Sequence, residues 1–255
     1  MNFDNAVFYL LDEGAGSSVY DSLSNGPTGE IVGTHTNIWS NPGNLTIGAS
    51  AGTVGDNAIK LRGSYIDDLM RLDNLNGSIV VMYWLRQPQI PTSGSRYVLS
   101  YGDIGSNADG AYAIQDMSNY LVYSRRGGAT FESCGYSITE PLTSSKNNTW
   151  FAYCIEIDVI DGKVVFSSYI NGTPQRGIRV FNLEPALPRV DSAGAGIRLL
   201  GRAAGVNGSA DYLWGGTQVK RMFIGRSSGE HRHNIPTWAR QFYENTYTTP
   251  EFVVM

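Results

Sequence analysis

An alternating stretch in the second half of the chain constrains the fold more than any other feature. From residue 153 to 159 every second residue is apolar, and the residues between are Cys154, Glu156 and Asp158. This is the period of two that a strand with one buried face requires. A second apolar run, at residues 164–170, follows closely enough to pair with the first. The stretch therefore predicts a β-hairpin.

Two tight-turn dipeptides bracket the second apolar run. Asp161 and Gly162 precede it, and Asn171 and Gly172 follow it. Both pairs tolerate positive φ, which the two-residue turns of β-hairpins need. We therefore expect one turn at each dipeptide.

Other strand candidates recur about every ten to fifteen residues without intervening helical periodicity, which favours a sandwich over alternating strands and helices. The candidates are residues 6–11, 19–21, 30–33, 57–63, 78–86, 97–101, 110–115, 120–124, 178–183, 197–201 and 218–225. Near the end, Pro236 precedes a segment in which Trp238 and Phe242 share a helical face, so one short helix is expected over 237–245. We expect a single all-β domain spanning residues 1–255, a two-sheet antiparallel jelly-roll sandwich with this one C-terminal helix.

The hydrophobic pattern also predicts which side chains lie inside the sandwich. The run 78–86 is the most continuous apolar segment and fits a central strand. We expect Trp84 and Trp150 to be largely buried, and Ile155 and Ile157 to face the core.

The amino-acid composition limits the kinds of partner that this chain can bind. Charged residues make up 16% of the chain and the net charge is -4, so there is no basic field to hold a nucleic acid. No apolar window reaches the length of a membrane span, and the N-terminus lacks the basic and apolar regions of a signal peptide. Few charges are present to protect edge strands, so a homo-oligomer or a docked subunit is expected. Cys134 and Cys154 are read as free thiols, with a disulfide between them as the alternative.

A set of landmarks follows in order along nearly the whole chain. They are the acidic and glycine-rich opening at 10–16, the Val19 to Asp21 segment with a turn at 24–26, the short strand 58–63, the strand 78–86 ending in Trp and Arg, the hairpin 149–172, and the closing segment 214–224 before the helix. Their order and spacing resemble the concanavalin A-like lectin/glucanase superfamily, in its laminin G-like and pentraxin-like branch. The resemblance implies a jelly roll with one curved face, which often binds glycans and is frequently aided by calcium.

Such folds also serve viruses as virion surface domains. Together with the Gly, Asn, Ser and Tyr content, this favours a non-enzymatic virion structural or surface protein, associated with a tail or capsid of a bacteriophage. A glycan or other virion proteins are then the expected partners. A secreted, extracellular carbohydrate-binding lectin module and a polysaccharide hydrolase remain as alternatives.

The hydrolase alternative depends on Glu156 and Asp161. The segment 156–161 resembles the Glu-x-Asp-x-x-Glu strand of laminarinase-type glucanases, and retaining hydrolysis needs two carboxyl groups about 5 to 5.5 Å apart. A spacing of five residues places Asp161 on the opposite face from Glu156 unless a bulge intervenes. The preferred interpretation therefore makes Glu156 and Asp158 the solvent-facing residues of the alternating strand.

Calcium is the cofactor that the resemblance implies. Asp103 and Asp109 flank the loop in which laminin G-like domains carry a ligating aspartate. Arg125 and Arg126 stand where those domains place the partner acid, and they oppose a cation. The His231 to His233 spacing occurs in metal sites, but no third ligand can be named, so a polar loop is preferred.

Aromatic side chains are the candidates for ligand binding. A sugar-binding face needs aromatic planes against C–H groups, together with a few polar groups. Trp39, Tyr101, Tyr112, Tyr120 and Tyr123 lie in segments that could reach a rim or a curved face. The alternative for each is a core or cross-strand position.

Overall fold

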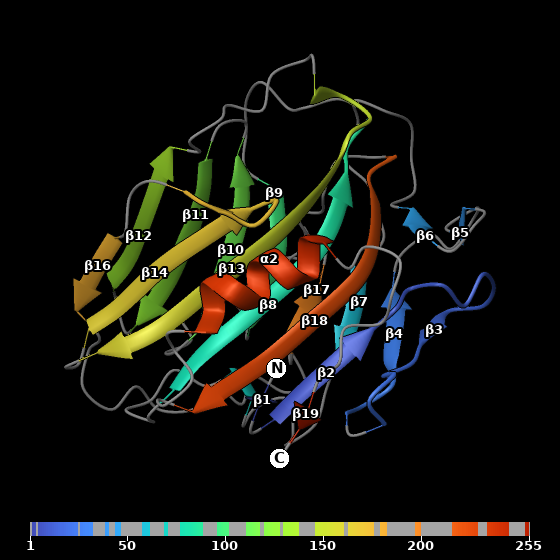
Figure 1. Cartoon of the computed structure of the whole chain (residues 1–255), viewed down its shortest axis with the longest axis horizontal. Coiled ribbons are helices and arrows are strands. Elements are labelled where there is room, and N and C mark those ends of the chain that lie inside the picture. The colour runs from blue at the N-terminus through green and yellow to red at the C-terminus, as the bar shows by residue number, and fades with distance from the viewer. Residues whose placement is uncertain are drawn as a thin grey trace.

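A computed structural model of the chain describes most of the expected strands (Figure 1). For parts of these segments, residues 111–137 included, it describes the backbone alone. The residues described are 2–3, 5–24, 26–32, 39–40, 44–46, 58–61, 69–70, 77–88, 96–101, 111–117, 120–127, 130–137, 146–160, 163–175, 179–182, 197–199, 216–228, 234–244 and 253–254.

Within these residues one sheet has nine strands, arranged in the order β15-β14-β13-β8-β18-β6-β5, with β2 also paired to β18 and β16 to β14. All of its pairings are antiparallel. Its strands are β2 (Asn5–Tyr9), β5 (Trp39–Ser40), β6 (Asn44–Thr46), β8 (Gly77–Arg86), β13 (Trp150–Ile160), β14 (Lys163–Ile170), β15 (Thr173–Pro174), β16 (Arg179–Asn182) and β18 (Gln218–Ser228).

The other sheet has eight strands in the described part of the chain, in the order β12-β11-β10-β9-β17-β7-β4-β3, and it is also antiparallel. Its strands are β3 (Ser18–Val19), β4 (Gly29–Val32), β7 (Ala58–Leu61), β9 (Arg96–Tyr101), β10 (Ala111–Met117), β11 (Tyr120–Gly127), β12 (Thr130–Ser137) and β17 (Ile197–Leu199). The sequence pattern did not predict β12, an edge strand of this sheet.

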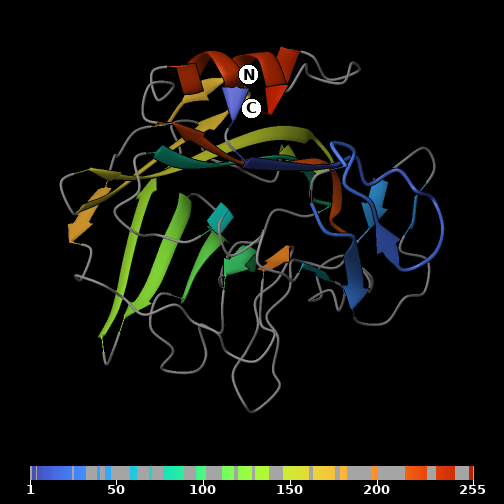
Figure 2. The same ribbon diagram turned by 90° about the horizontal axis from the view of Figure 1, so that it is seen from below.

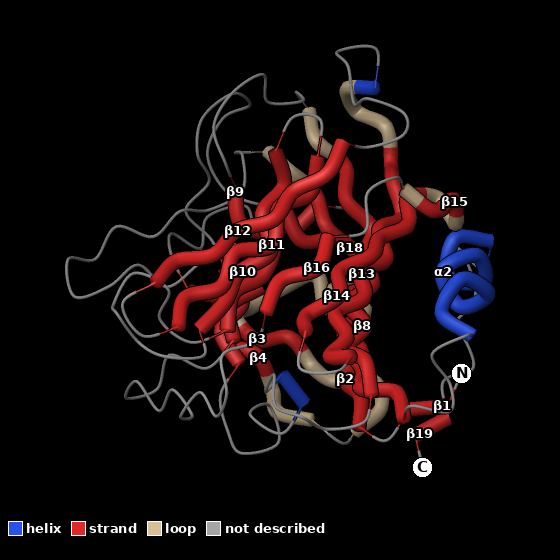
Figure 3. The backbone as a smooth tube through the Cα atoms, turned by 90° about the vertical axis from the view of Figure 1, so that its left-hand side faces the viewer, coloured by secondary structure: helices blue, strands red, loops and turns tan. Residues whose placement is uncertain are grey.

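Helix α2 (Ile235–Glu244) adds a third layer. Figure 2 shows the helix, the nine-stranded sheet and the eight-stranded sheet stacked in that order. Strands β1 (Asn2–Phe3) and β19 (Val253–Val254) pair in parallel, and Figure 3 shows them on the same side of the nine-stranded sheet as the helix. The two ends of the chain therefore meet beside α2. The all-β sandwich with one short C-terminal helix is confirmed.

The position of strand β8 between two cores explains why its sequence is apolar almost throughout. Ile79, Val81, Tyr83 and Leu85 belong to the core between the sheets, whereas the alternate residues 80, 82 and 84 belong to a second core under α2. Both faces of the strand are covered, which removes the polar side of the usual alternation. The expected burial of Trp84 is confirmed, since its side chain is 4% exposed.

The hairpin forms as the sequence predicts. Strand β13 pairs with β14 so that Ile160 lies opposite Lys163, and residues 161–162, where the turn is predicted, lie outside the described residues. Ile155 and Ile157 are fully buried between the sheets. Trp150 is partly buried and packs against the core under α2, which agrees with the expectation that it is largely buried.

Glu156 and Asp158 point away from the inter-sheet core, as expected, but they are not solvent-facing. Asp158 is 3% exposed and Glu156 is half-buried. On the same face, Ala152 and Cys154 are covered by the layer that contains α2. The outer face of this sheet is therefore covered at these residues, and the prediction of solvent-facing carboxylates is wrong.

Cys154 is a buried free thiol, in agreement with the expectation for this residue. The side chain of Cys134 lies outside the described residues. Within the described part of the chain, no helix has the length and apolar character that a membrane crossing would need.

Candidate functional site

The sequence-predicted aromatic residues have different positions. Tyr101 is 3% exposed and belongs to the inter-sheet core. This burial supports the core interpretation of Tyr101, because the ring has no free face for a sugar. The backbones of Tyr112, Tyr120 and Tyr123 lie in β10 and β11, while their side chains are outside the described residues.

Trp39 is the member of this set with a described side chain near the surface. It is half-buried in β5 and packs against the inter-sheet core. Its indole Nε1 donates a hydrogen bond to the carbonyl of Gly16 at 3.0 Å.

The candidate catalytic and metal residues were predicted mainly in segments that lie outside the described residues, namely Asp103, Asp109, Asp161, His231 and His233. Among the described residues, no group of three His, Cys, Asp or Glu side chains could hold a metal ion.

Glu156 is described, and its carboxylate is held by hydroxyl groups. Ser78 Oγ donates to Oε1 at 3.0 Å, and Ser167 Oγ donates to Oε2 at 2.7 Å. Both serines come from the strands that flank β13. The arrangement gives the buried acid hydrogen-bond partners on two sides, which is how a structural carboxylate is accommodated inside a protein.

A surface group with different properties forms at the loop of residues 12–20. Glu13 Oε1 accepts the backbone N–H of Tyr20 at 2.7 Å, so the carboxylate closes the loop on itself. Gly16, near the middle of the loop, has a φ of +80°, a left-handed conformation that glycine adopts without steric cost. The Trp39 indole holds the carbonyl of this same glycine.

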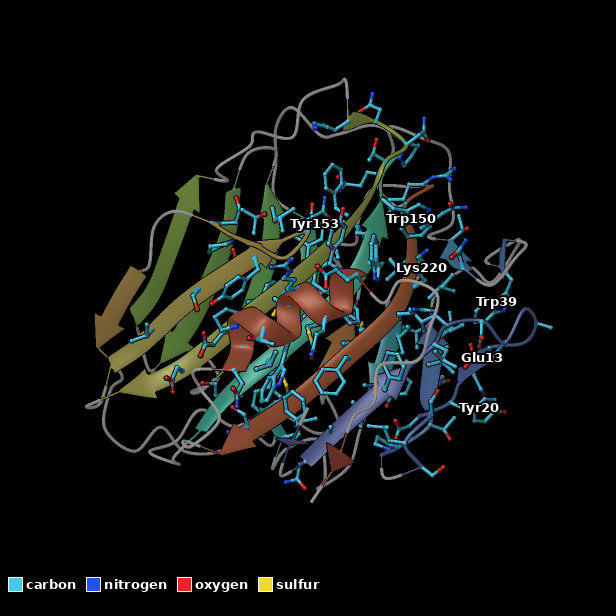
Figure 4. All side chains as sticks on the ribbon, in the orientation of Figure 1. Glu13, Tyr20, Trp39, Trp150, Tyr153 and Lys220 are labelled. Carbon is cyan, nitrogen blue, oxygen red and sulfur yellow. The ribbon has the colours of Figure 1, made fainter. Side chains whose placement is uncertain are left out.

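Glu13, Tyr20 and Trp39 are together called the loop site here, and Figure 4 shows them at the same margin of the molecule. The Tyr20 side chain is 59% exposed. The second carboxylate oxygen of Glu13, Oε2, is buried and has no hydrogen-bond partner in the structure. The loop site thus offers an exposed aromatic ring, a tryptophan edge and an acceptor without a donor.

These groups match the chemistry of a sugar. A pyranose presents C–H groups that pack on an aromatic plane and hydroxyl groups that donate hydrogen bonds. A carboxylate oxygen accepts such bonds, and a buried acceptor gains most from acquiring a donor. Burying a ligand hydroxyl against Glu13 Oε2 would satisfy both groups.

The sequence predicted Trp39 as a ligand-binding candidate but did not predict Glu13 or Tyr20. Both lie in a segment without regular period, where no pattern separates an exposed tyrosine from a buried one. The signal that was available is the pair of glycines at 14 and 16 between them, which marks a loop tight enough to bring its ends together.

No protein-family model matches this sequence, and no curated protein matches it either. Solved structures match its fold. The binding domain of botulinum neurotoxin DC in complex with rat synaptotagmin II has a TM-score of 0.59 at 14% identity, over 96% of this chain and 52% of that chain.

Two further solved structures match the fold of this chain. A structure of botulinum neurotoxin type C, whose cell entry depends on two ganglioside molecules, has a TM-score of 0.55 at 13% identity, over 92% of this chain and 51% of that one. The CBM40 of the Ruminococcus gnavus IT-sialidase, bound to alpha2,3 sialyllactose, has a TM-score of 0.50 at 15% identity and covers 77% of this chain and 95% of that chain.

This chain spans about half the length of the neurotoxin binding domains that it matches. At these identities the likeness shows the fold, and it does not carry over residues of a site. It agrees with the two-sheet architecture read from the chain itself.

Proposed function

We propose that this protein is a non-enzymatic, glycan-binding module and that the loop site receives the sugar. The observation that carries the proposal is the buried Glu13 Oε2, an acceptor without a donor, beside the exposed ring of Tyr20. Two of the matched structures support it at the level of fold, since one belongs to a toxin whose cell entry depends on gangliosides and the other is bound to sialyllactose.

In this proposal Tyr20 supplies the stacking plane, and Glu13 fixes the orientation of one sugar hydroxyl. Trp39 acts by holding the loop through Gly16. Preorganisation matters here because ordering a loop upon binding reduces affinity. The loop is already closed by Glu13 at one end and anchored by Trp39 near its middle.

A glycan array followed by calorimetry tests the proposal. Tyr20→Ala should weaken binding of an array hit about tenfold, equivalent to the loss of roughly 1.4 kcal/mol, whereas Tyr20→Phe should retain most of the affinity. Glu13→Gln should also weaken binding, because an amide nitrogen at the Oε2 position cannot accept a hydroxyl proton.

Glu30→Gln is the matched control, since Glu30 is an exposed carboxylate on β4, outside the loop site. It should leave the affinity unchanged. Array hits whose affinity is the same in Tyr20→Ala, Glu13→Gln and wild type would rule out the loop site while leaving glycan binding in place. An array without hits would contradict glycan binding itself.

We also propose a superfamily, a location and partners for this protein. The order of the sequence landmarks supports the concanavalin A-like superfamily. A virion surface, with copies of the chain or other virion proteins as neighbours, is the proposed location, and a secreted lectin is the alternative. Mass spectrometry of purified virions tests this location. The protein should be present in them, and its absence would favour the secreted lectin.

A further inference from the structure

A second group of aromatic and basic side chains lies on the outer face of the nine-stranded sheet, far along the chain from the loop site. Strand register places Trp150 opposite Arg86, and Trp84 opposite Lys220, on three neighbouring strands. Cross-strand neighbours on one face lie within side-chain reach. These four residues, with Tyr243 of α2, are called the lysine–tryptophan cluster.

Two cations share one indole in this cluster. Lys220 Nζ lies 4.5 Å from the ring centroid of Trp150 and 5.3 Å from that of Trp84. Arg86 Cζ lies 6.0 Å from the Trp150 centroid. Figure 4 shows Trp150 and Lys220 together above the loop site. Each ring attracts a cation through its quadrupole, but this attraction does not neutralise the charge.

Neither cation has an acidic partner within the described part of the chain, whereas Arg240 forms an ion pair with Glu244 there. The chain has more acids than bases, with 23 Asp and Glu against 19 Lys and Arg. Acidic side chains are therefore not scarce, yet Arg86 and Lys220 meet aromatic rings instead. An anion approaching this face would find two positive charges without a competing carboxylate among the described groups.

The backbone of β18 is distorted next to Lys220. The register against β8 shifts between Lys220 and Phe223, and Arg221 has a φ of +50°. Val219 and Met222, on either side of the irregularity, both belong to the inter-sheet core. The bulge therefore absorbs one residue, keeps the core alternation and prevents a charged side chain from entering the core. Bulges of this kind often re-aim side chains at binding sites.

Trp84 adds a donor without an acceptor. Its side chain is 4% exposed, and its Nε1 is buried without a hydrogen-bond partner among the described residues. Tyr243, 38% exposed, stacks on Trp84 with centroids 5.9 Å apart and planes at 25°. The cluster therefore contains an unsatisfied N–H, two cations and an exposed ring plane.

The environment of Lys220 favours the approach of an anion. Burial lowers the pKa of Lys220, and the neighbouring Arg221 lowers it further. A nearby negative charge has the opposite effect, because it favours the ammonium form. An anionic ligand at this position would thus stabilise the charged form of Lys220.

We propose that the lysine–tryptophan cluster is a second binding site, specific for the carboxylate of an acidic sugar. Lys220 and Arg86 receive the carboxylate, and the exposed parts of Trp150 and Tyr243 pack against the sugar ring. The proposed site is independent of the loop site, because it uses other residues on other strands. An acidic pyranose suits the cluster better than a small inorganic anion because it occupies the charges and the aromatic planes together.

Calorimetry with methyl glucuronide and with N-acetylneuraminic acid tests this site, and methyl glucoside serves as the neutral partner of the first probe. Wild type should bind at least one acidic probe, and methyl glucoside should bind at least tenfold more weakly than methyl glucuronide. Affinity for the acidic probe should fall between 50 mM and 500 mM salt, because exposed charge pairs are screened. The two acidic probes distinguish a uronic acid from a sialic acid as the source of the carboxylate.

Substitutions in the lysine–tryptophan cluster test whether the acidic probe binds there. Lys220→Gln and Arg86→Gln should each weaken the acidic probe about tenfold or more, and Lys220→Arg should restore most of the affinity. Arg240→Gln removes one positive charge from α2 outside the cluster and should change affinity less than twofold.

Lys220→Arg and Arg86→Gln keep the test valid if Lys220→Gln does not fold. Equal binding of methyl glucoside and methyl glucuronide would overturn the proposal. The proposal would also be overturned if the affinity for the acidic probe were unchanged in Arg86→Gln and in every folded variant of Lys220. It would be overturned as well if sodium sulfate competed with the acidic probe as strongly as the sugars do. Absence of binding by both acidic probes would overturn it as well.

Discussion

The side-chain oxygen of Asn171 accepts the backbone N–H of Ala152 at 2.9 Å, and the Ala152 carbonyl accepts the backbone N–H of Asn171 at 2.8 Å. One turn residue thus prolongs the β13–β14 ladder past its last paired residues, Tyr153 and Ile170. Asn171 and Gly172 have φ values of 50° and 74°, the positive pair of a tight hairpin turn. The dipeptide predicted as a turn therefore also completes the hydrogen bonding of a buried strand.

Asn171→Gly should destabilise the protein although glycine accepts the same backbone angles. The substitution leaves the buried Ala152 N–H without an acceptor, at a cost of about 1–3 kcal/mol. Urea unfolding measures the change. Ser24→Gly is the control, because Ser24 also has a positive φ, of 59°, and its side chain has no hydrogen bond in the structure. Equal stability of Asn171→Gly and wild type would contradict the assigned role.

Gly172→Ala should cost more than Gly16→Ala. Both glycines have positive φ, 74° and 80°, so both substitutions carry the left-handed penalty of about 1–2 kcal/mol. A Cβ at Gly172 would also lie 3.0 Å from Arg240 Cα on the helix, whereas one at Gly16 would meet nothing within 4 Å. The difference in unfolding free energy between the two variants reports the contact between turn and helix. A difference of zero would show that α2 moves away without cost.

Asp21→Asn should destabilise the opening of the chain. Asp21 Oδ1 accepts the backbone N–H of Phe8 at 2.7 Å and of Leu23 at 3.2 Å, and Oδ2 accepts that of Gly26 at 2.7 Å. An amide places a donor against one of these N–H groups, so we expect a loss of about 1.5–3 kcal/mol in urea unfolding. Glu30→Gln, an exposed acid on a neighbouring strand, should cost less than 0.5 kcal/mol. A similar loss in both variants would show that Asp21 has no special role.

Tyr169 should ionise at unusually high pH. Burial, followed in size by the negative charges of Glu156 and Cys154, raises the pKa of its phenol from 10 to about 12. The unfolded chain loses this proton near pH 10 while the folded protein retains it, so the associated stability is present below pH 10 and is lost as pH rises toward 12. The urea midpoint of wild type should therefore fall relative to Tyr169→Phe over this window.

The difference in ultraviolet absorbance between wild type and Tyr169→Phe measures the same ionisation. Glu156→Gln should lower the pKa, because it removes a negative charge. A transition near pH 10 in wild type, or one that Glu156→Gln does not move, would contradict the assigned causes.

The protein should not cleave β-glucans. Both oxygens of Glu156 accept hydroxyl hydrogen bonds from Ser78 and Ser167, which favours a structural acid over a catalytic one. Incubation with laminarin or lichenan should release no reducing ends. Release by wild type that Glu156→Gln abolishes would support the hydrolase alternative instead.

Local periodicity and turn residues were sufficient to predict most of the strands. The hairpin at β13 and β14, the central strand β8 and the C-terminal helix all occur where their patterns indicated. The helix begins at Ile235, slightly before the predicted start. Strand β12 was missed because its sequence, residues 130–137, contains few apolar residues and no regular alternation, and an edge strand needs less of both.

The chemical environment of individual residues was decided by contacts between distant segments. Asp158 follows the polar phase of its strand, yet it is buried, and on the same face of that strand Ala152 and Cys154 are covered by the layer of α2. Glu13 and Tyr20 come together through one loop closure, and Lys220 meets Trp150 through strands 70 residues apart in the chain. By itself, the sequence determined the strands, their turns and the antiparallel class, since these depend on neighbouring residues. Only the tertiary structure decided which faces are covered and which charges lack a partner, because both depend on the way the layers pack.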